Sequence, residues 1–104
     1  MKNSNLNIYN FNIPKEGEIF NNLFKNSNLT ITQIVSSNNL EIKEYNQDVN
    51  EFVILLEGYA TLEIEGCIKD LKKGDCLYIP AHTKHKVLKA SNGALWLAIY
   101  FKCN

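Results

Sequence analysis

The sequence has no excess of positive or negative charge, because eleven basic residues balance eleven acidic ones in a chain of 104 residues. No stretch gathers basic residues with interleaved aromatics, the pattern with which nucleic-acid-binding domains hold phosphates. We therefore expect no nucleic acid partner. Apolar residues make up 45% of the sequence and charged residues 21%, which is the composition of a single globular domain.

Long apolar runs are also missing. No segment reaches the roughly 18 apolar residues that a helix needs to span a bilayer. The first residues also lack the apolar run of a secretory signal. We therefore expect a cytoplasmic protein that does not bind membranes.

Cysteine is scarce and irregularly spaced. The chain has three cysteines, Cys67, Cys76 and Cys103, and none of them forms a CxxC pair. An odd number without that spacing indicates neither a disulfide framework nor a zinc knuckle. Each cysteine is expected to be a reduced structural thiol.

The segment 14–26 predicts one short amphipathic helix. Pro14 suits the first helical turn, and the acidic Glu16 and Glu18 would lie near the positive end of the helix dipole. Four apolar residues recur at helical spacing in this segment: Ile19, Phe20, Leu23 and Phe24.

The rest of the chain alternates apolar and polar residues and predicts short strands. The expected strands are residues 29–35, 51–57, 59–65, 76–79 and 94–101. Turns are expected at 66–70 and 72–75, and short strands with frequent turns are typical of a barrel or sandwich. We expect one domain, residues 14–104, preceded by a polar and partly mobile segment, residues 1–13.

The last expected strand, residues 94–101, is apolar on both faces. An exposed strand of this kind would aggregate, so it must be covered inside a two-sheet barrel or at an interface between copies. Together with the apolar strand at 29–35, this favours a homodimer with twofold symmetry.

Two motifs in the second half of the chain resemble those of the cupin superfamily. The second cupin motif, G-x5-P-x-G-x2-H-x3-N, is matched at Gly74, Pro80 and His85. The first motif, G-x5-HxH-x3,4-E-x6-G, is matched at its end by Glu51 and Gly58, and fifteen residues separate Gly58 from Gly74.

The resemblance covers motif one at about residues 45–58 and motif two at 74–89, and it is closest to small bacterial single-domain cupins of unassigned activity. It implies an all-β fold, the double-stranded β-helix or jelly-roll barrel of six to eight strands, with one short N-terminal helix added here. It also implies a site inside the mouth of the barrel.

Both imidazoles of the HxH pair are absent from this chain. The pair falls on Tyr45 and Gln47 with a three-residue gap before Glu51, or on Glu44 and Asn46 with a four-residue gap. Metal-binding cupins take two ligands from this pair, so the resemblance implies a degenerate metal site.

The second motif departs from the family at two further positions, because its second Gly is His82 and its closing Asn is Lys89. A second imidazole therefore lies close in sequence to His85. A divalent transition metal needs three or more such protein ligands, and these residues do not distinguish zinc, iron, nickel and manganese. The candidate metal ligands are Gln47, Glu51, His82 and His85.

A small-molecule site would use the same residues with two tyrosines added. Tyr45, Gln47 and Glu51 have equal parity, so they face the same side of a strand that has no bulge. Tyr78 is the second tyrosine, although aromatic residues on strands more often serve in packing than in ligand binding. The alternative for Glu51 and His85 is a hydrogen-bonded pair that satisfies two buried polar groups.

These residues are compatible with three functions, and they do not decide whether the protein is an enzyme. The first is a small-molecule-binding cupin that uses the barrel mouth, with or without a metal. The second is a metal-dependent enzyme, namely an oxygenase, isomerase or lyase. The third is a metal-free isomerase with His85 or His82 as the general base.

Overall fold

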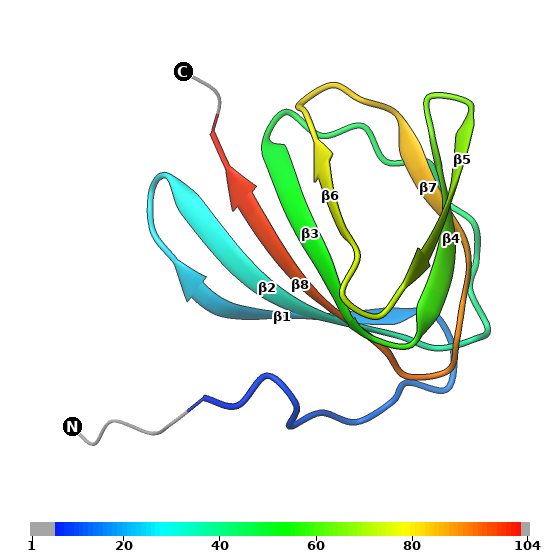
Figure 1. The fold of residues 1–104 in the computed structure, drawn as a ribbon. Coiled ribbons are helices and arrows are strands. Elements are labelled where there is room, and N and C mark those ends of the chain that lie inside the picture. Colours follow the sequence, from blue (N-terminus) through cyan, green and yellow to red (C-terminus); the bar gives the residue numbers. More distant parts are fainter. Residues whose placement is uncertain (1–5, 103–104) are drawn as a thin grey trace.

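The computed structural model describes residues 6–102, which form eight strands and no helix (Figure 1). Within that range no helix is therefore long and apolar enough to cross a membrane. The strands are β1 Glu18–Lys25, β2 Leu29–Ser36, β3 Asn50–Glu57, β4 Tyr59–Ile64, β5 Cys67–Lys72, β6 Cys76–Ile79, β7 His85–Ala90 and β8 Ala94–Phe101.

The strands form two antiparallel sheets. The larger has the order β1-β2-β8-β3-β6 and the smaller the order β5-β4-β7. Figure 1 shows the two sheets facing each other like the walls of a barrel, with the β1–β2 hairpin extending past the smaller sheet. The all-β expectation is confirmed.

The helix expected at 14–26 is wrong, because this segment contains β1, which pairs with β2. The register shifts between Asn22 and Phe24, which marks a β-bulge. Phe20 pairs with the inward-facing Ile34, whereas Phe24 pairs with Ile31 on the opposite face. A bulged strand does not keep a strict two-residue period, so its apolar residues can fall at helical spacing, and pairing with β2 overrides this local pattern.

The turn expected at 66–70 is also too long. Only Glu65 and Gly66 connect β4 to β5, and both have positive φ angles, of 46° and 83°. Two consecutive positive φ angles give the tight hairpin turn whose twist matches that of the flanking strands. Cys67 and Cys76 are free thiols in the described residues, and Cys103 lies outside them.

The hydrophobic core fills the space between the sheets. Leu55 of β3 is fully buried, and Trp96 of β8 is 2% exposed. The smaller sheet contributes Leu62 of β4 and Leu71 of β5 from the other side. Alternation along each strand thus directs one face of each sheet into a shared core.

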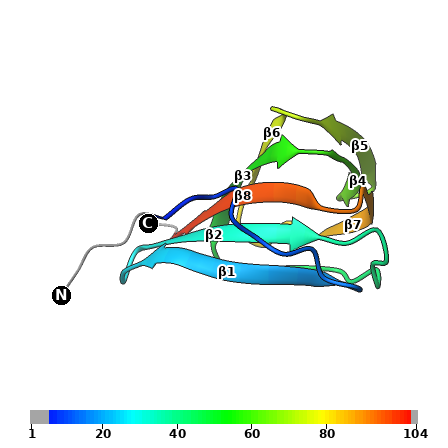
Figure 2. The same cartoon turned by 90° about the horizontal axis from the view of Figure 1, so that it is seen from below.

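The chain before β1 crosses the outer face of the larger sheet over β2 and β8 (Figure 2). The side-chain amide of Gln33 donates a hydrogen bond to the Ile8 carbonyl oxygen at 2.7 Å. Val35 and Leu95 pair on this outer face and are nevertheless fully buried. Of the segment expected to be mobile, residues 1–5 lie outside the described residues.

Candidate functional site

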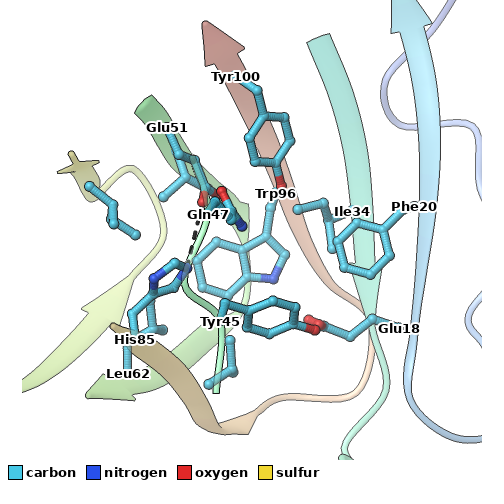
Figure 3. Close-up of a pocket in the computed structure, with 13 residues that line it drawn as sticks. Glu18, Phe20, Ile34, Tyr45, Gln47, Glu51, Leu62, His85, Trp96 and Tyr100 are labelled. Atoms are coloured by element: carbon cyan, nitrogen blue, oxygen red, sulfur yellow. Dashed lines mark ion pairs between the residues drawn. The ribbon is translucent and has the colours of Figure 1, made fainter. Parts of the chain in front are cut away.

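A cavity of about 50 Å³ opens between the two sheets, which is room for a few waters or one end of a small ligand (Figure 3). Its walls are mostly apolar, with a few polar groups that converge on it. The lining residues are Glu18, Phe20, Ile34, Tyr45, Gln47, Glu51, Val53, Leu62, Ile79, His85, Val87, Trp96 and Tyr100.

The larger sheet positions Glu51 at the cavity. Glu51 lies on β3, shares its face with Val53 and Leu55, and is 6% exposed. Its partner across the β3–β8 register is Tyr100, which therefore projects into the same cavity. Sequence reasoning missed Tyr100, since the strand at 94–101 is apolar on both faces and gives no sign of which one faces inward.

His85 enters the cavity from the smaller sheet and is anchored by Tyr45. The two residues form an antiparallel bridge, in which the Tyr45 N–H donates to the His85 oxygen at 2.7 Å and the His85 N–H donates back at 3.0 Å. Their rings stack with centroids 5.7 Å apart. The bridge ties the segment before β3 to the start of β7.

The imidazole of His85 presents one nitrogen to Glu51. Its Nδ1–H donates to the Thr83 carbonyl oxygen at 2.9 Å, so Nε2 is the nitrogen directed into the cavity. Nε2 lies 3.7 Å from Oε1 of Glu51, and both side chains are almost fully buried. Neither nitrogen is left without a polar neighbour.

Burial raises the pKa of Glu51 to about 7, and the negative charge of Glu18 adds to the rise. Near neutral pH this carboxyl is therefore present in both its protonated and its ionised form. The Glu51 carboxyl, which faces Nε2 of His85, can therefore either donate or accept a hydrogen bond in the cavity.

Glu18 is a cavity residue that sequence reasoning missed. A hydrogen-bond chain holds it, because the Trp96 indole N–H donates to Ser36 Oγ at 3.0 Å and this hydroxyl donates to the Glu18 carboxylate. Figure 3 shows Tyr45 pointing from His85 toward Glu18. Glu18 and Phe20 are two residues apart, so in a strand they share one face, and this was the available signal that Glu18 lies beside an apolar inner residue. The helical spacing of the same segment obscured that signal.

Burial also sets the pKa of the other ionisable cavity groups. It raises the pKa of Glu18, against the hydrogen bond from Ser36 and the positive charge of Lys43. It likewise raises the pKa of Tyr45 and of Tyr100, and the nearby carboxylates add to both shifts. Both tyrosines are therefore neutral hydrogen-bonding groups at physiological pH.

Four of the six predicted site residues line the cavity, and two do not. Tyr45, Gln47, Glu51 and His85 come together there.

His82 is exposed in the turn after β6, and its backbone N–H donates to the backbone carbonyl oxygen of Gln47 at 2.6 Å. Tyr78 is 53% exposed on the outer face of the larger sheet, where its ring stacks on Phe101. Their side chains therefore lie away from the cavity, and the interpretation of His82 as a replacement ligand loses its geometric basis.

The donor set does not fit a transition metal. No group of three or more His, Cys, Asp or Glu side chains that could hold a metal occurs among residues 6–102. The described residues also leave no buried side-chain polar atom without a partner. Where the family has a pair of imidazoles, Tyr45 stacks on His85 and Gln47 offers only a weak neutral amide.

The fold and the two motifs define the class of protein. The cupin domain model matches residues 33–100, well over half of the chain, and the chain belongs to the cupin family. No curated protein is similar to it at a significant level.

Solved structures show the same fold. A Ralstonia eutropha protein provisionally named a mannose-6-phosphate isomerase is 25% identical with a TM-score of 0.84, covering 97% of this chain and 100% of its own. A Streptococcus pyogenes protein of unknown function is 19% identical with a TM-score of 0.82, covering 100% and 91%. An RmlC-like cupin from Shewanella frigidimarina is 20% identical with a TM-score of 0.75, covering 85% and 78%.

Proposed function

We propose that this cupin binds a small organic molecule in the cavity between its sheets, without a metal. The observation that carries the proposal is the buried pair of Glu51 and His85, whose facing atoms lie 3.7 Å apart in a cavity with mostly apolar walls. A concave apolar site with a few convergent polar groups and a shifted pKa is the usual form of a ligand site.

The polar groups at the cavity suit a ligand that both donates and accepts hydrogen bonds. Glu51 and Gln47 offer oxygens as acceptors, and the hydroxyls of Tyr45 and Tyr100 offer protons. The apolar walls contribute the burial energy, and these polar groups set the orientation of the ligand.

A thermal-shift screen with small metabolites and divalent metals tests the proposal. A ligand at about 100 times its dissociation constant stabilises the folded state by about 2.7 kcal/mol. We expect stabilisation by an organic ligand that Val87→Phe abolishes, since Val87 lines the cavity. The control is Leu88→Phe, at the next residue of β7 and outside the cavity lining. Stabilisation by metals alone would contradict the proposal.

A second candidate is metal-free isomerisation of an α-hydroxy carbonyl compound. The same pair favours it, because Nε2 of His85 can accept a proton from the carbon beside the carbonyl. Protonated Glu51 can then give its proton to the carbonyl oxygen, which leaves a neutral enediol. His85 then returns its proton to the former carbonyl carbon while the ionised Glu51 takes the proton of the other hydroxyl, so that a new carbonyl forms at the neighbouring carbon and both residues regain their starting protonation.

Deuterium uptake from heavy water tests this second candidate. We expect the protein to speed exchange of the α-proton of glyceraldehyde, and His85→Asn to lose the effect while still folding. His82→Asn is the matched control, because His82 lies outside the cavity. Equal exchange with and without protein would leave binding alone as the proposed function.

A further inference from the structure

The cavity combines two carboxyl groups with a shortage of positive charge. Of the described residues that line it, Glu18 and Glu51 are acidic, and none is lysine or arginine. His85 is the one side chain there that can become a cation, and it is already paired with Glu51. The whole sequence has no arginine, the residue that binds phosphates and carboxylates with two parallel hydrogen bonds.

Glu18 is fixed in place as part of the cavity wall. Its carboxylate accepts the hydrogen bond from Ser36, and Ser36 is held in turn by the indole of Trp96. Ser36 is fully buried and Trp96 is 2% exposed, so the chain that orients Glu18 belongs to the core. A carboxylate held this way does not swing out of the cavity to make room for an anion.

The charged residues on the surface next to Glu18 do not offset the negative charge of the cavity. A neighbouring surface depression shares Glu18 and Tyr45 with the cavity. Its other charged residues are Glu16, Glu41 and Lys43, so a single lysine stands among three glutamates. Lys43 is exposed, and solvent screens its charge.

We propose that Glu18 is a specificity-determining residue that restricts this cavity to neutral or cationic small ligands with hydroxyl or amine groups, and excludes carboxylates and phosphates. The proposal rests on the proposed binding function and deepens it. An anion in the cavity would lose its water and meet the carboxyl groups of Glu18 and Glu51 without a lysine or arginine to compensate its charge. A hydroxyl or ammonium group would instead donate hydrogen bonds to those same oxygens.

The name of the Ralstonia neighbour suggests a sugar phosphate as ligand, which the cavity of this chain would exclude. A sugar phosphate is bound by cationic groups, and the cavity of this chain is lined by two glutamates and no lysine or arginine. Among sugars, this cavity suits an unphosphorylated or an amino sugar.

Three probes of nearly equal shape test the inference, namely isobutylamine, isobutanol and isobutyrate. Trp96 is the only tryptophan in the sequence, so a ¹⁵N correlation spectrum has a single indole signal, and this N–H donates into the Glu18 chain. Titrations are done at pH 8, above the raised pKa of Glu51. We expect the amine and the alcohol to shift the signal saturably, and the carboxylate to bind at least about tenfold more weakly.

The variant Glu18→Gln should bring the affinities for amine and carboxylate to within about threefold of each other. Glu16→Gln is the matched control, because it removes the same charge from an exposed residue outside the cavity lining, and it should keep the wild-type preference. Glu18→Asn serves if Glu18→Gln does not fold, and the order of the three affinities in the unaltered protein tests the charge preference without any variant.

Failure of the proposed role of Glu18 and failure of the proposed binding function give different results. Binding of isobutyrate as tight as that of isobutylamine, or an unchanged preference in Glu18→Gln, overturns the role of Glu18 and leaves the binding function standing. Absence of any shift with all three probes overturns the small-molecule site itself, and the role of Glu18 with it.

Discussion

The carboxyl of Glu51 is protonated more readily in the folded chain than in the unfolded one. Its pKa rises from an ordinary 4.5 to about 7 through burial. Between these values the folded state binds more protons than the unfolded state, so stability is highest at low pH and falls as pH rises toward 7. The loss is on the order of 3 kcal/mol.

We therefore expect wild-type protein to lose more stability between pH 5 and pH 8 than Glu51→Gln does. Urea unfolding at the two pH values measures the difference. Glu44→Gln, at an exposed glutamate before β3, should keep the wild-type dependence. The same pH dependence in Glu51→Gln as in wild type would show that this carboxyl titrates normally.

His82 occupies a backbone position better suited to glycine. Its φ angle is 64°, in the left-handed region, where a side chain costs about 1 kcal/mol or more. The second cupin motif has its glycine here, and the positive φ angle gives the physical reason. We expect His82→Gly to raise the free energy of unfolding by about 0.5–1 kcal/mol in urea titrations, with ligand binding unchanged. Destabilisation by this change would indicate that the His82 side chain makes contacts of its own.

At the scale of the strands, the connection between β3 and β4 depends on Gly58. Its φ angle is 88°, and a methyl group added to it would clash with Ser91 Oγ and lie 3.2 Å from the Cα of Ala94. Ser91 cannot simply rotate away, because its hydroxyl oxygen accepts a hydrogen bond from the N–H of Tyr59. The first motif ends in glycine because two loops meet at this point.

We expect Gly58→Ala to destabilise the fold by about 2–4 kcal/mol, from backbone strain and overpacking together. Gly74→Ala is the matched comparison, since Gly74 has a φ angle of 92° with open space around it, and its cost should stay near 1 kcal/mol. Thermal or urea unfolding of the two variants measures the difference. Equal costs would show that the loops yield to the added methyl.

Five of the eight strands could be predicted from the sequence, whereas β1, β5 and β7 were not. The strands at 29–35, 51–57 and 94–101 carry dense apolar or β-branched runs that determine their type locally. β1 contains a bulge, and its partner β2 determines its conformation. That error also removed Glu18 from the predicted site.

At the scale of the whole molecule, an apolar patch remains on the outer face of the larger sheet. Phe52 is 36% exposed, and its partners in register are Tyr78 and Ile99. Phe101 lies beside them, stacked on Tyr78. The segment before β1 runs over β2 and β8 of the same sheet, whereas Phe52 and Tyr78 lie on β3 and β6 (Figure 2).

We propose that two copies pair through this patch as a homodimer, since contiguous exposed apolar surface on a sheet favours a self-complementary contact. Light scattering should give twice the chain mass for the wild type and the monomer mass for Phe52→Lys combined with Tyr78→Lys. Tyr59→Lys is the control, because Tyr59 is 60% exposed on the smaller sheet. A monomeric wild type at micromolar concentration would contradict the proposal.

The sequence by itself determined the family and indicated the two residues that face each other in the cavity, Glu51 and His85, because motif spacing and strand alternation are local properties of the chain. Only the tertiary structure decided what surrounds them. Glu18 and Tyr100 reach the cavity because their strands pair with strands that are distant in sequence. His82 lies outside the cavity, in a turn where its own φ angle is positive. Non-local pairing and backbone geometry do not appear in residue order, and they determine the charge of this cavity.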